Sequence, residues 1–177
     1  DLSMVGANPL YITVGFILEE GFPLDDLKKV LSSMSDAAEK ADVKIVAGDT
    51  KVVNKGKGDG IFINTSGIGI IKDRIDISPS RVKIGDKVIL SGPIGNHGIS
   101  IMGERNGLTF EPPVLSDTAP LNSLVRDMLK ITKKVHAMRD PTRGGLATTL
   151  KEFATDSGYC IVIEEKLIPV PSGVKGA

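Results

Sequence analysis

A run of eight uncharged residues, Tyr11–Leu18, constrains the fold of this chain more than any other feature. Nearly every residue in the run is apolar or β-favouring, which is typical of a strand. We therefore expect a strand that is buried on both faces. Because such a strand needs other elements packed against it, the run predicts a layered α/β arrangement.

The segment after this run has the pattern of an amphipathic helix. Pro23, Asp25 and Asp26 suit a helix start, because acidic groups favour the positive end of the helix dipole. Apolar residues then recur at spacings of three and four: Leu24, Leu27, Val30, Leu31, Met34, Ala38 and Ala41. This spacing predicts a helix over 24–41 that packs one face on a sheet.

The rest of the chain continues the alternation of strands and helices. We expect further strands over 43–47, 61–71, 87–90, 135–138 and 159–164. Gly67 and Gly69 indicate a bend or bulge in the strand over 61–71. We expect further helices over 97–106, 121–129 and 146–156. A break near Pro79 divides the chain into two predicted α/β domains, residues 1–78 and 79–177.

Composition excludes several classes of function. Lysine plus arginine and aspartate plus glutamate number 22 each, so charge gives no reason to expect nucleic acid or an anionic membrane as a partner. No apolar run approaches the ~20 residues that span a bilayer. Two histidines and one cysteine argue against a tetrahedral zinc site. Cys160 reads as a buried strand residue, and a lone cysteine fits a reducing, cytoplasmic location.

The string Gly48-Asp49-Thr50-Lys51 is the first candidate for chemistry. We place it at the carboxyl end of the strand over 43–47, where a carboxylate can hold Mg²⁺ against nucleotide phosphates. The lysine could contact phosphate or accept a proton. The alternative is a turn in which Asp49 bonds to its own backbone and Lys51 faces water.

A second candidate is Asp140-Pro141-Thr142-Arg143-Gly144-Gly145, which joins a strand to a helix. Its glycines allow close approach of an anion to the backbone amides, and Arg143 adds a fork of donors. The alternative is a tight turn with Asp140 paired to Arg143. In the glycine-rich loop Ser91–Gly98, His97 could donate a proton or contact phosphate, or could simply be a solvated group. Asp1 reads as the N-cap of a short helix.

Four strings in this order resemble the HypE family of hydrogenase maturation proteins, within the aminoimidazole ribonucleotide synthetase (PurM-like) superfamily. The strings are Asp1–Ala7, Gly15–Gly21, Gly48–Val53 and Asp140–Leu146. The resemblance implies a two-domain PurM-like α+β fold with mixed sheets, each packed with helices. It also implies an N-terminal domain that forms a homodimer and binds ATP and Mg²⁺.

The resemblance further implies an ATP-dependent carbamoyl dehydratase. Such an enzyme converts a carboxamide on its own C-terminal cysteine to a thiocyanate, the source of the cyano ligands of nickel–iron hydrogenase. The implied partners are a carbamoyltransferase (HypF-like) and an iron-scaffold complex (HypC/HypD-like).

The resemblance assigns roles to individual residues. Asp1 and Asp49 match metal–nucleotide aspartates, and Lys51 matches a base or phosphate contact. The other residues implied to bind the nucleotide are Thr50, His97, Asp140, Thr142, Arg143, Gly144 and Gly145.

The chain departs from the family pattern in three places. Asn96 stands where the family usually has aspartate. The glycine-rich segment before Asp1 and the cysteine-bearing tail are both expected to lie outside these 177 residues, and Cys160 does not replace the tail thiol. The fragment is therefore expected to be inactive alone. The alternatives are a selenophosphate or purine-pathway synthetase of the same fold, and a non-catalytic docking fragment.

Overall fold

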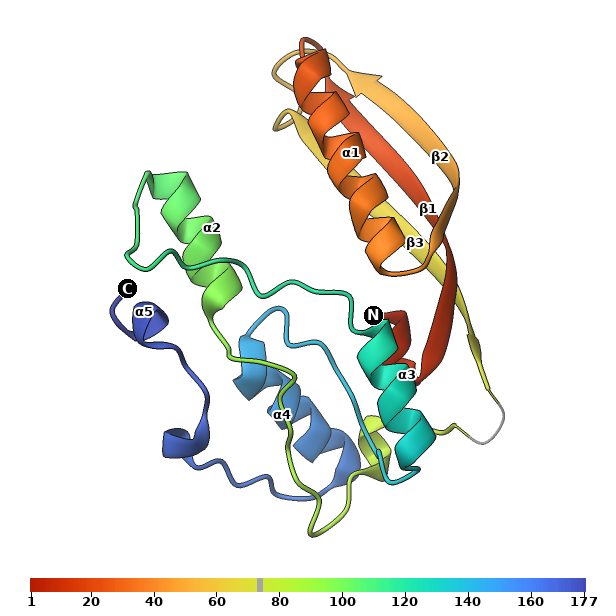
Figure 1. Ribbon diagram of the computed structural model, residues 1–177, viewed down its shortest axis with the longest axis vertical. Coiled ribbons are helices and arrows are strands. Elements are labelled where there is room, and N and C mark those ends of the chain that lie inside the picture. The colour runs from red at the N-terminus through yellow and green to blue at the C-terminus, as the bar shows by residue number, and fades with distance from the viewer. Residues whose placement is uncertain (73–74) are drawn as a thin grey trace. The chain divides into compact units, whose positions relative to one another are not determined.

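The structure is a computed structural model that describes residues 1–72 and 75–177. Figure 1 shows its helices and strands. In chain order they are η1 (Leu2–Val5), β1 (Ala7–Glu19), α1 (Leu24–Lys40), β2 (Lys44–Val53), β3 (Ile61–Ile71), η2 (Pro79–Arg81), α2 (Asn96–Asn106), α3 (Asn122–Ile131), α4 (Gly145–Ser157), η3 (Glu165–Leu167) and α5 (Ser172–Lys175).

The three strands form one mixed sheet in the order β2-β1-β3. β1 pairs with β2 in parallel and with β3 in antiparallel orientation. A parallel pair needs a crossover connection, and α1 supplies it. Figure 1 shows α1 lying over one face of the sheet. The predictions of a strand over 11–18, a helix over 24–41 and a strand over 61–71 are confirmed.

The two faces of the sheet differ in burial. Val14 is only 4% exposed, whereas Tyr11 and Ile17 on the opposite face of β1 are each 43% exposed. The expectation of a strand buried on both faces is therefore wrong, because alternate side chains point to opposite faces and α1 lies over only one. We call the other face the open face. It carries Tyr11, Thr13, Gly15 and Ile17 of β1 and the residues paired with them.

The pairing of the strand over 61–71 is irregular, but the bulge lies in its neighbour β1 and not in the strand that was predicted to carry it. The pairing of β1 with β3 shifts between Pro9, which faces Gly69, and Tyr11, which faces Ile68. The extra residue, Leu10, belongs to β1. A Cβ on Gly69 would lie 2.8 Å from the carbonyl oxygen of Asn8, so the close approach of the strands requires glycine there.

The strands expected over 87–90, 135–138 and 159–164 do not form in the described chain. A strand needs a neighbour for its backbone hydrogen bonds, and the described residues offer these segments none. Their apolar side chains are left open: Ile89 is 86% exposed and Val162 is 83% exposed. Cys160 is also exposed, which corrects the expectation that it is buried in a strand. The three helices expected in this half are confirmed as α2, α3 and α4.

The chain divides into two compact units that are interleaved in sequence. Unit 1 comprises residues 1–82 and 120–157, and unit 2 comprises residues 83–119 and 158–177. The predicted domains 1–78 and 79–177 stay a prediction.

Unit 1 is held together by a small core and by polar contacts. All five buried apolar side chains of the described chain belong to unit 1: Ala7, Val14, Val43, Val125 and Leu150. Asn122 at the start of α3 donates a 2.7 Å hydrogen bond to the carbonyl of Ala41, just after α1. In unit 2, the N–H of Ile94 donates to the carbonyl of Pro169 at 3.0 Å.

Candidate functional site

Asp49 and Lys51 lie within a strand rather than after one. β2 continues to Val53, so the expectation that Gly48–Lys51 follows the strand is wrong. Glycine and aspartate are unfavourable in strands, but here the register with β1 holds from Thr13 to Glu19 and overrides that preference. Asp49 and Lys51, two residues apart, therefore point to the same face, with Cα atoms about 7 Å apart.

That face is the open face. Asp49 is paired with Gly15, and Gly15 is paired on its other side with Asn64 of β3. A Cβ on Gly15 would find only the carbonyl oxygen of Asn64 within 4 Å. Asp49, Gly15 and Asn64 therefore form a row across the three strands, with a polar side chain on each outer strand and no side chain between them. In the next row, Ile17 lies between Lys51 and Phe62.

The carboxylate of Asp49 has one local partner. Its Oδ1 accepts a 2.8 Å hydrogen bond from the N–H of Thr50. This is the backbone contact that the alternative interpretation expected, although it forms in a strand and not in a turn. The second carboxylate oxygen is left for other ligands. Asp49, Thr50 and Lys51 are all exposed, so this stretch of β2 is open to solvent.

Asp1 occupies the N-cap position of η1, as expected, but its side chain makes no capping hydrogen bond. The backbone carbonyl of Asp1 instead accepts the N–H of Met4 at 2.9 Å. The carboxylate is therefore not committed to the helix. Among the residues that the structure describes, no group of three or more His, Cys, Asp or Glu side chains could by itself hold a metal ion.

The loop from Asp140 to Gly145 leads into α4, and glycine is required at its end. Gly144 and Gly145 have φ values of 72° and 57°, in the left-handed region that side chains disfavour. A Cβ on Gly144 would also lie 2.0 Å from Oγ1 of Thr148, whereas a Cβ on Gly145 would meet nothing within 4 Å. The backbone closes on itself here, because the N–H of Gly145 donates to the carbonyl of Thr142 at 3.2 Å.

The expected alternative for this loop, a pair between Asp140 and Arg143, is not found among the described ion pairs. Instead Nη1 of Arg139 lies 2.7 Å from Oε2 of Glu152 on α4. The contact is an ion pair and not an aligned hydrogen bond. Arg143 is exposed, and its guanidinium is available to an anion beside the start of α4. The sequence motifs did not indicate this contact, because Arg139 and Glu152 lie 13 residues apart in the sequence.

His97 belongs to unit 2, whereas every other predicted site residue belongs to unit 1. It lies in the first turn of α2, and its Nδ1 is 2.9 Å from Oγ of Ser116. Beside it, Oδ1 of Asn96 is buried without a hydrogen-bond partner. The sequence interpretation overlooked Ser116, because nothing in a serine 19 residues away indicates such a contact.

A further carboxylate, Glu19, shapes the loop between β2 and β3. It accepts hydrogen bonds from the N–H of Gly56 and, at 3.1 Å, from that of Gly60. These backbone donors, Gly56 first, hold the pKa of Glu19 below its ordinary value. The loop between β2 and β3, which crosses the end of β1, is thus fixed by a residue of β1. Within the described chain, no helix is long and apolar enough to cross a membrane.

Two family models together cover nearly the whole chain. The N-terminal domain of the AIR synthase related proteins matches residues 1–71, and the C-terminal domain of the same family matches residues 83–176. Among curated proteins, the carbamoyl dehydratase HypE of Cupriavidus necator is 50% identical over 177 residues, covering 100% of this chain and 50% of that protein. HypE of Escherichia coli is 41% identical, covering 99% of this chain and 52% of that protein.

Solved structures agree with these matches. HypE in complex with ATP has a TM-score of 0.97 at 46% identity and covers 99% of this chain and 52% of that one. HypE in a HypE–HypF complex has a TM-score of 0.94 at 50% identity, covering 98% of this chain and 57% of that one. A thiamine monophosphate kinase of Aquifex aeolicus, at 16% identity and a TM-score of 0.72, covers 98% of this chain and 59% of that one and shares the fold alone.

The chain spans about half the length of the curated relatives it matches. The expected mixed α/β, PurM-like class is confirmed by the two family models and the HypE structures. The chain belongs to the AIR synthase related family, and along its whole length it is similar to HypE proteins.

Proposed function

We propose that the protein to which this chain belongs is an ATP-dependent carbamoyl dehydratase. The observation that carries the proposal is 50% identity to a carbamoyl dehydratase HypE along the entire chain. The reaction converts a carboxamide on the thiol of a C-terminal cysteine to a thiocyanate. ATP supplies a phosphoryl group, and the products are the thiocyanate, ADP and phosphate.

The chemistry explains which side chains are needed. An amide oxygen is a poor leaving group, and transfer of the γ-phosphoryl group to that oxygen lets it depart as phosphate. The two N–H protons of the amide must also be removed, which requires a base. Lys51 is the base or phosphate contact in this proposal, because its ammonium or amine group lies on the open face beside Asp49.

The residues of unit 1 fit a magnesium–nucleotide site in type. Mg²⁺ prefers carboxylate oxygens, and both Asp1 and Asp49 offer oxygens that no helix cap or ion pair of the described chain occupies. When bound, Mg²⁺ would neutralise phosphate charge. Thr142 offers a hydroxyl group to the nucleotide and lies in the same loop as Asp140. The side chain of Thr50 points to the face of the sheet opposite to Asp49 and Lys51, so in this proposal Thr50 contributes through its backbone.

Arg143 and the backbone of Gly144 and Gly145 add the donors that suit an anion at the start of α4. His97 of unit 2 is a further proton donor or phosphate contact in this proposal.

The open face also supports a homodimer. It exposes Tyr11 and Ile17 of β1, and on β3 Phe62 is 47% exposed and Ile68 is 65% exposed. Apolar surface of this extent is typical of a face that is covered by another molecule. The proposed partners in the reaction sequence are a HypF-like carbamoyltransferase and a HypC/HypD-like iron scaffold, in the cytoplasm. One relative is known in a complex with HypF.

Mass spectrometry of the whole protein tests the proposal. With ATP, Mg²⁺ and an active carbamoyltransferase, the carbamoylated terminal cysteine should lose the mass of one water. Persistence of the carbamoyl mass while ATP and the partner enzyme are both active would contradict the proposed reaction.

Variants assign the roles. Asp49→Asn removes one negative charge and should weaken Mg²⁺–ATP binding, whereas Asp36→Asn on the exposed side of α1 serves as the matched control. Lys51→Ala should leave binding partly intact and slow dehydration. Equal ATP affinity in Asp49→Asn and Asp36→Asn would remove Asp49 from the site.

A further inference from the structure

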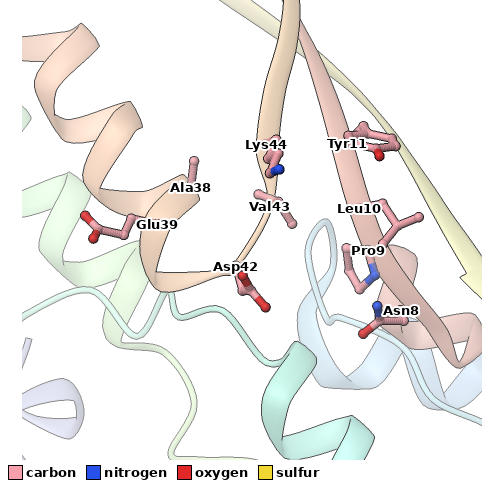
Figure 2. Close-up of a pocket in the computed structure, with 9 residues that line it drawn as sticks. All are labelled: Asn8, Pro9, Leu10, Tyr11, Ala38, Glu39, Asp42, Val43 and Lys44. Atoms are coloured by element: carbon pink, nitrogen blue, oxygen red, sulfur yellow. The ribbon is translucent and has the colours of Figure 1, made fainter.

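Unit 1 contains two groups of charged side chains that the proposed function does not use. Figure 2 shows the first, around a hollow of about 360 Å³ between the end of α1 and the starts of β1 and β2. Its charged residues Glu39, Asp42 and Lys44 are exposed and form no ion pair within the described chain, so no fixed geometry identifies a ligand there. The second is the ion pair between Arg139 and Glu152, which lies beside the loop that leads into α4.

This ion pair draws the chain before α4 back toward the helix. Glu152 lies seven residues after Gly145, the first residue of α4, which corresponds to about 10 Å along the helix axis. Arg139 precedes Gly145 by six residues, yet its Nη1 lies 2.7 Å from Oε2 of Glu152. The segment before α4 therefore turns back toward the helix instead of extending away from it, and Figure 1 shows it running beside α4.

A second contact holds the same segment three residues earlier. The N–H of Ser78 donates to the carbonyl of His136 at 2.9 Å. Ser78 directly precedes η2, and η2 packs against α4. The backbone at His136 and the side chain of Arg139 are thus both tied to neighbouring elements of unit 1. The loop from Asp140 to Gly145 therefore begins at a fixed point.

The pair also separates the roles of the two arginines next to α4. Oε2 of Glu152 is shielded from solvent, and a shielded carboxylate oxygen is costly without a cation beside it. Arg139 supplies that cation and is neutralised by it. Arg143, in contrast, is exposed and has no ion pair within the described chain. Arg143 is therefore the cation of the loop that an anion can reach.

We propose that Glu152 is a positioning residue that holds the loop Asp140–Gly145, through Arg139, in the geometry that binds phosphate. Glu152 acts through Arg139 and does not itself contact the ligand. The proposal rests on the proposed function for the identity of that ligand, the phosphate groups of ATP. The geometry of the loop can be measured without ATP, so the two proposals can be tested apart.

Amide hydrogen exchange in the whole protein tests the geometry without a ligand. Glu152→Gln keeps the shape of the side chain and removes its charge. Exchange at Gly145, whose N–H donates to the carbonyl of Thr142, should then become about two- to five-fold faster. Asp156→Asn is the matched control, because Asp156 is exposed on α4 and has no ion pair in the described chain. Equal exchange at Gly145 in the two variants would overturn the proposal.

Steady-state kinetics of the dehydration test the consequence. Glu152→Gln and Arg139→Gln should each raise KM for ATP about two- to five-fold, the range for a half-exposed ion pair, with a smaller change in kcat. The double variant should raise KM no more than either single variant, because all three remove the same pair. Additive effects would refute action through Arg139. A merely structural role would lower the free energy of unfolding and leave KM of the folded protein unchanged.

Arg143→Gln separates failure of this proposal from failure of the proposed function. If Arg143→Gln raises KM for ATP and Glu152→Gln does not, the loop binds ATP but Glu152 does not position it. If neither variant changes KM while exchange at Gly145 responds to Glu152→Gln, the loop does not bind the nucleotide. That result would refute the place of the loop in the proposed function, and with it the phosphate role of the pair.

Discussion

Replacing Gly144 by alanine should destabilise the protein more than the same change at Gly145. Both residues have positive φ, and a side chain in the left-handed region costs roughly 1–2 kcal/mol. The steric terms differ, because a Cβ on Gly144 would lie 2.0 Å from Oγ1 of Thr148 while a Cβ on Gly145 would meet nothing within 4 Å. Overpacking of this kind adds about 1–3 kcal/mol.

The expected losses in the free energy of unfolding are therefore about 2–5 kcal/mol for Gly144→Ala and about 1–2 kcal/mol for Gly145→Ala. Urea unfolding of the whole protein, followed by circular dichroism, measures both. Gly145→Ala is the matched control, since it shares the loop and the backbone conformation.

A third variant separates the steric term from the backbone term. In Gly144→Ala, adding Thr148→Ala removes Oγ1 but leaves the Cβ of residue 148, which lies 2.8 Å from the new methyl group. The second change should therefore restore only part of the lost free energy. Equal losses in the two glycine variants would refute the argument that Thr148 makes glycine necessary at position 144.

Three further predictions concern other parts of unit 1. Glu19→Gln should speed amide hydrogen exchange at Gly56 and Gly60. In the wild type, the ionised carboxylate of Glu19 holds this loop. Because the pKa of Glu19 is lowered, the stabilisation is fully present at pH values above the ordinary carboxyl pKa and is lost as pH falls through the lowered pKa. Leu150→Ala should cost about 2–5 kcal/mol in thermal or urea unfolding, since Leu150 is 5% exposed, and a loss below 1 kcal/mol would contradict its core position. Leu31→Ala should cost less than half as much, because Leu31 is 45% exposed.

The sequence was sufficient to locate the four longer helices, α1 to α4. Leu27, Val30 and Met34 mark the face of α1 that is less exposed, and their spacing alone shows it. Leu31 shares the helical spacing but not the burial. Periodicity identifies the apolar stripe of a helix, whereas the edge of that stripe depends on how far the neighbouring sheet extends.

The sequence was misleading where pairing decides the structure. Gly48 and Asp49 read as the end of a strand, but hydrogen bonding to β1 carries β2 through them to Val53. The converse holds at Ile89 and Val162, which have strand-like surroundings but no neighbouring strand in the described chain. A strand is a property of two segments, so a pattern in one segment can only suggest it.

The candidate site was predicted as a set of residues and not as an arrangement. The strings around Asp49 and Asp140 both lie in unit 1. That Asp49 and Asn64 lie on either side of Gly15 follows only from the strand register. The contacts of Arg139 with Glu152 and of His97 with Ser116 are long-range, and no local pattern encodes them.

The interleaving of the two units affects the order in which the protein can form during synthesis. The sheet of unit 1 leaves the ribosome first, but α3 and α4 follow only after residues 83–119 of unit 2. Because synthesis proceeds at about 5–20 residues per second, several seconds pass between the synthesis of the sheet and that of the helices that complete its unit. A nascent chain of this kind exposes apolar strands during that interval and is a natural client for chaperones. For the same reason, unit 1 can be isolated by protein engineering only if Val82 is joined to Pro120 and the chain is stopped after Ser157.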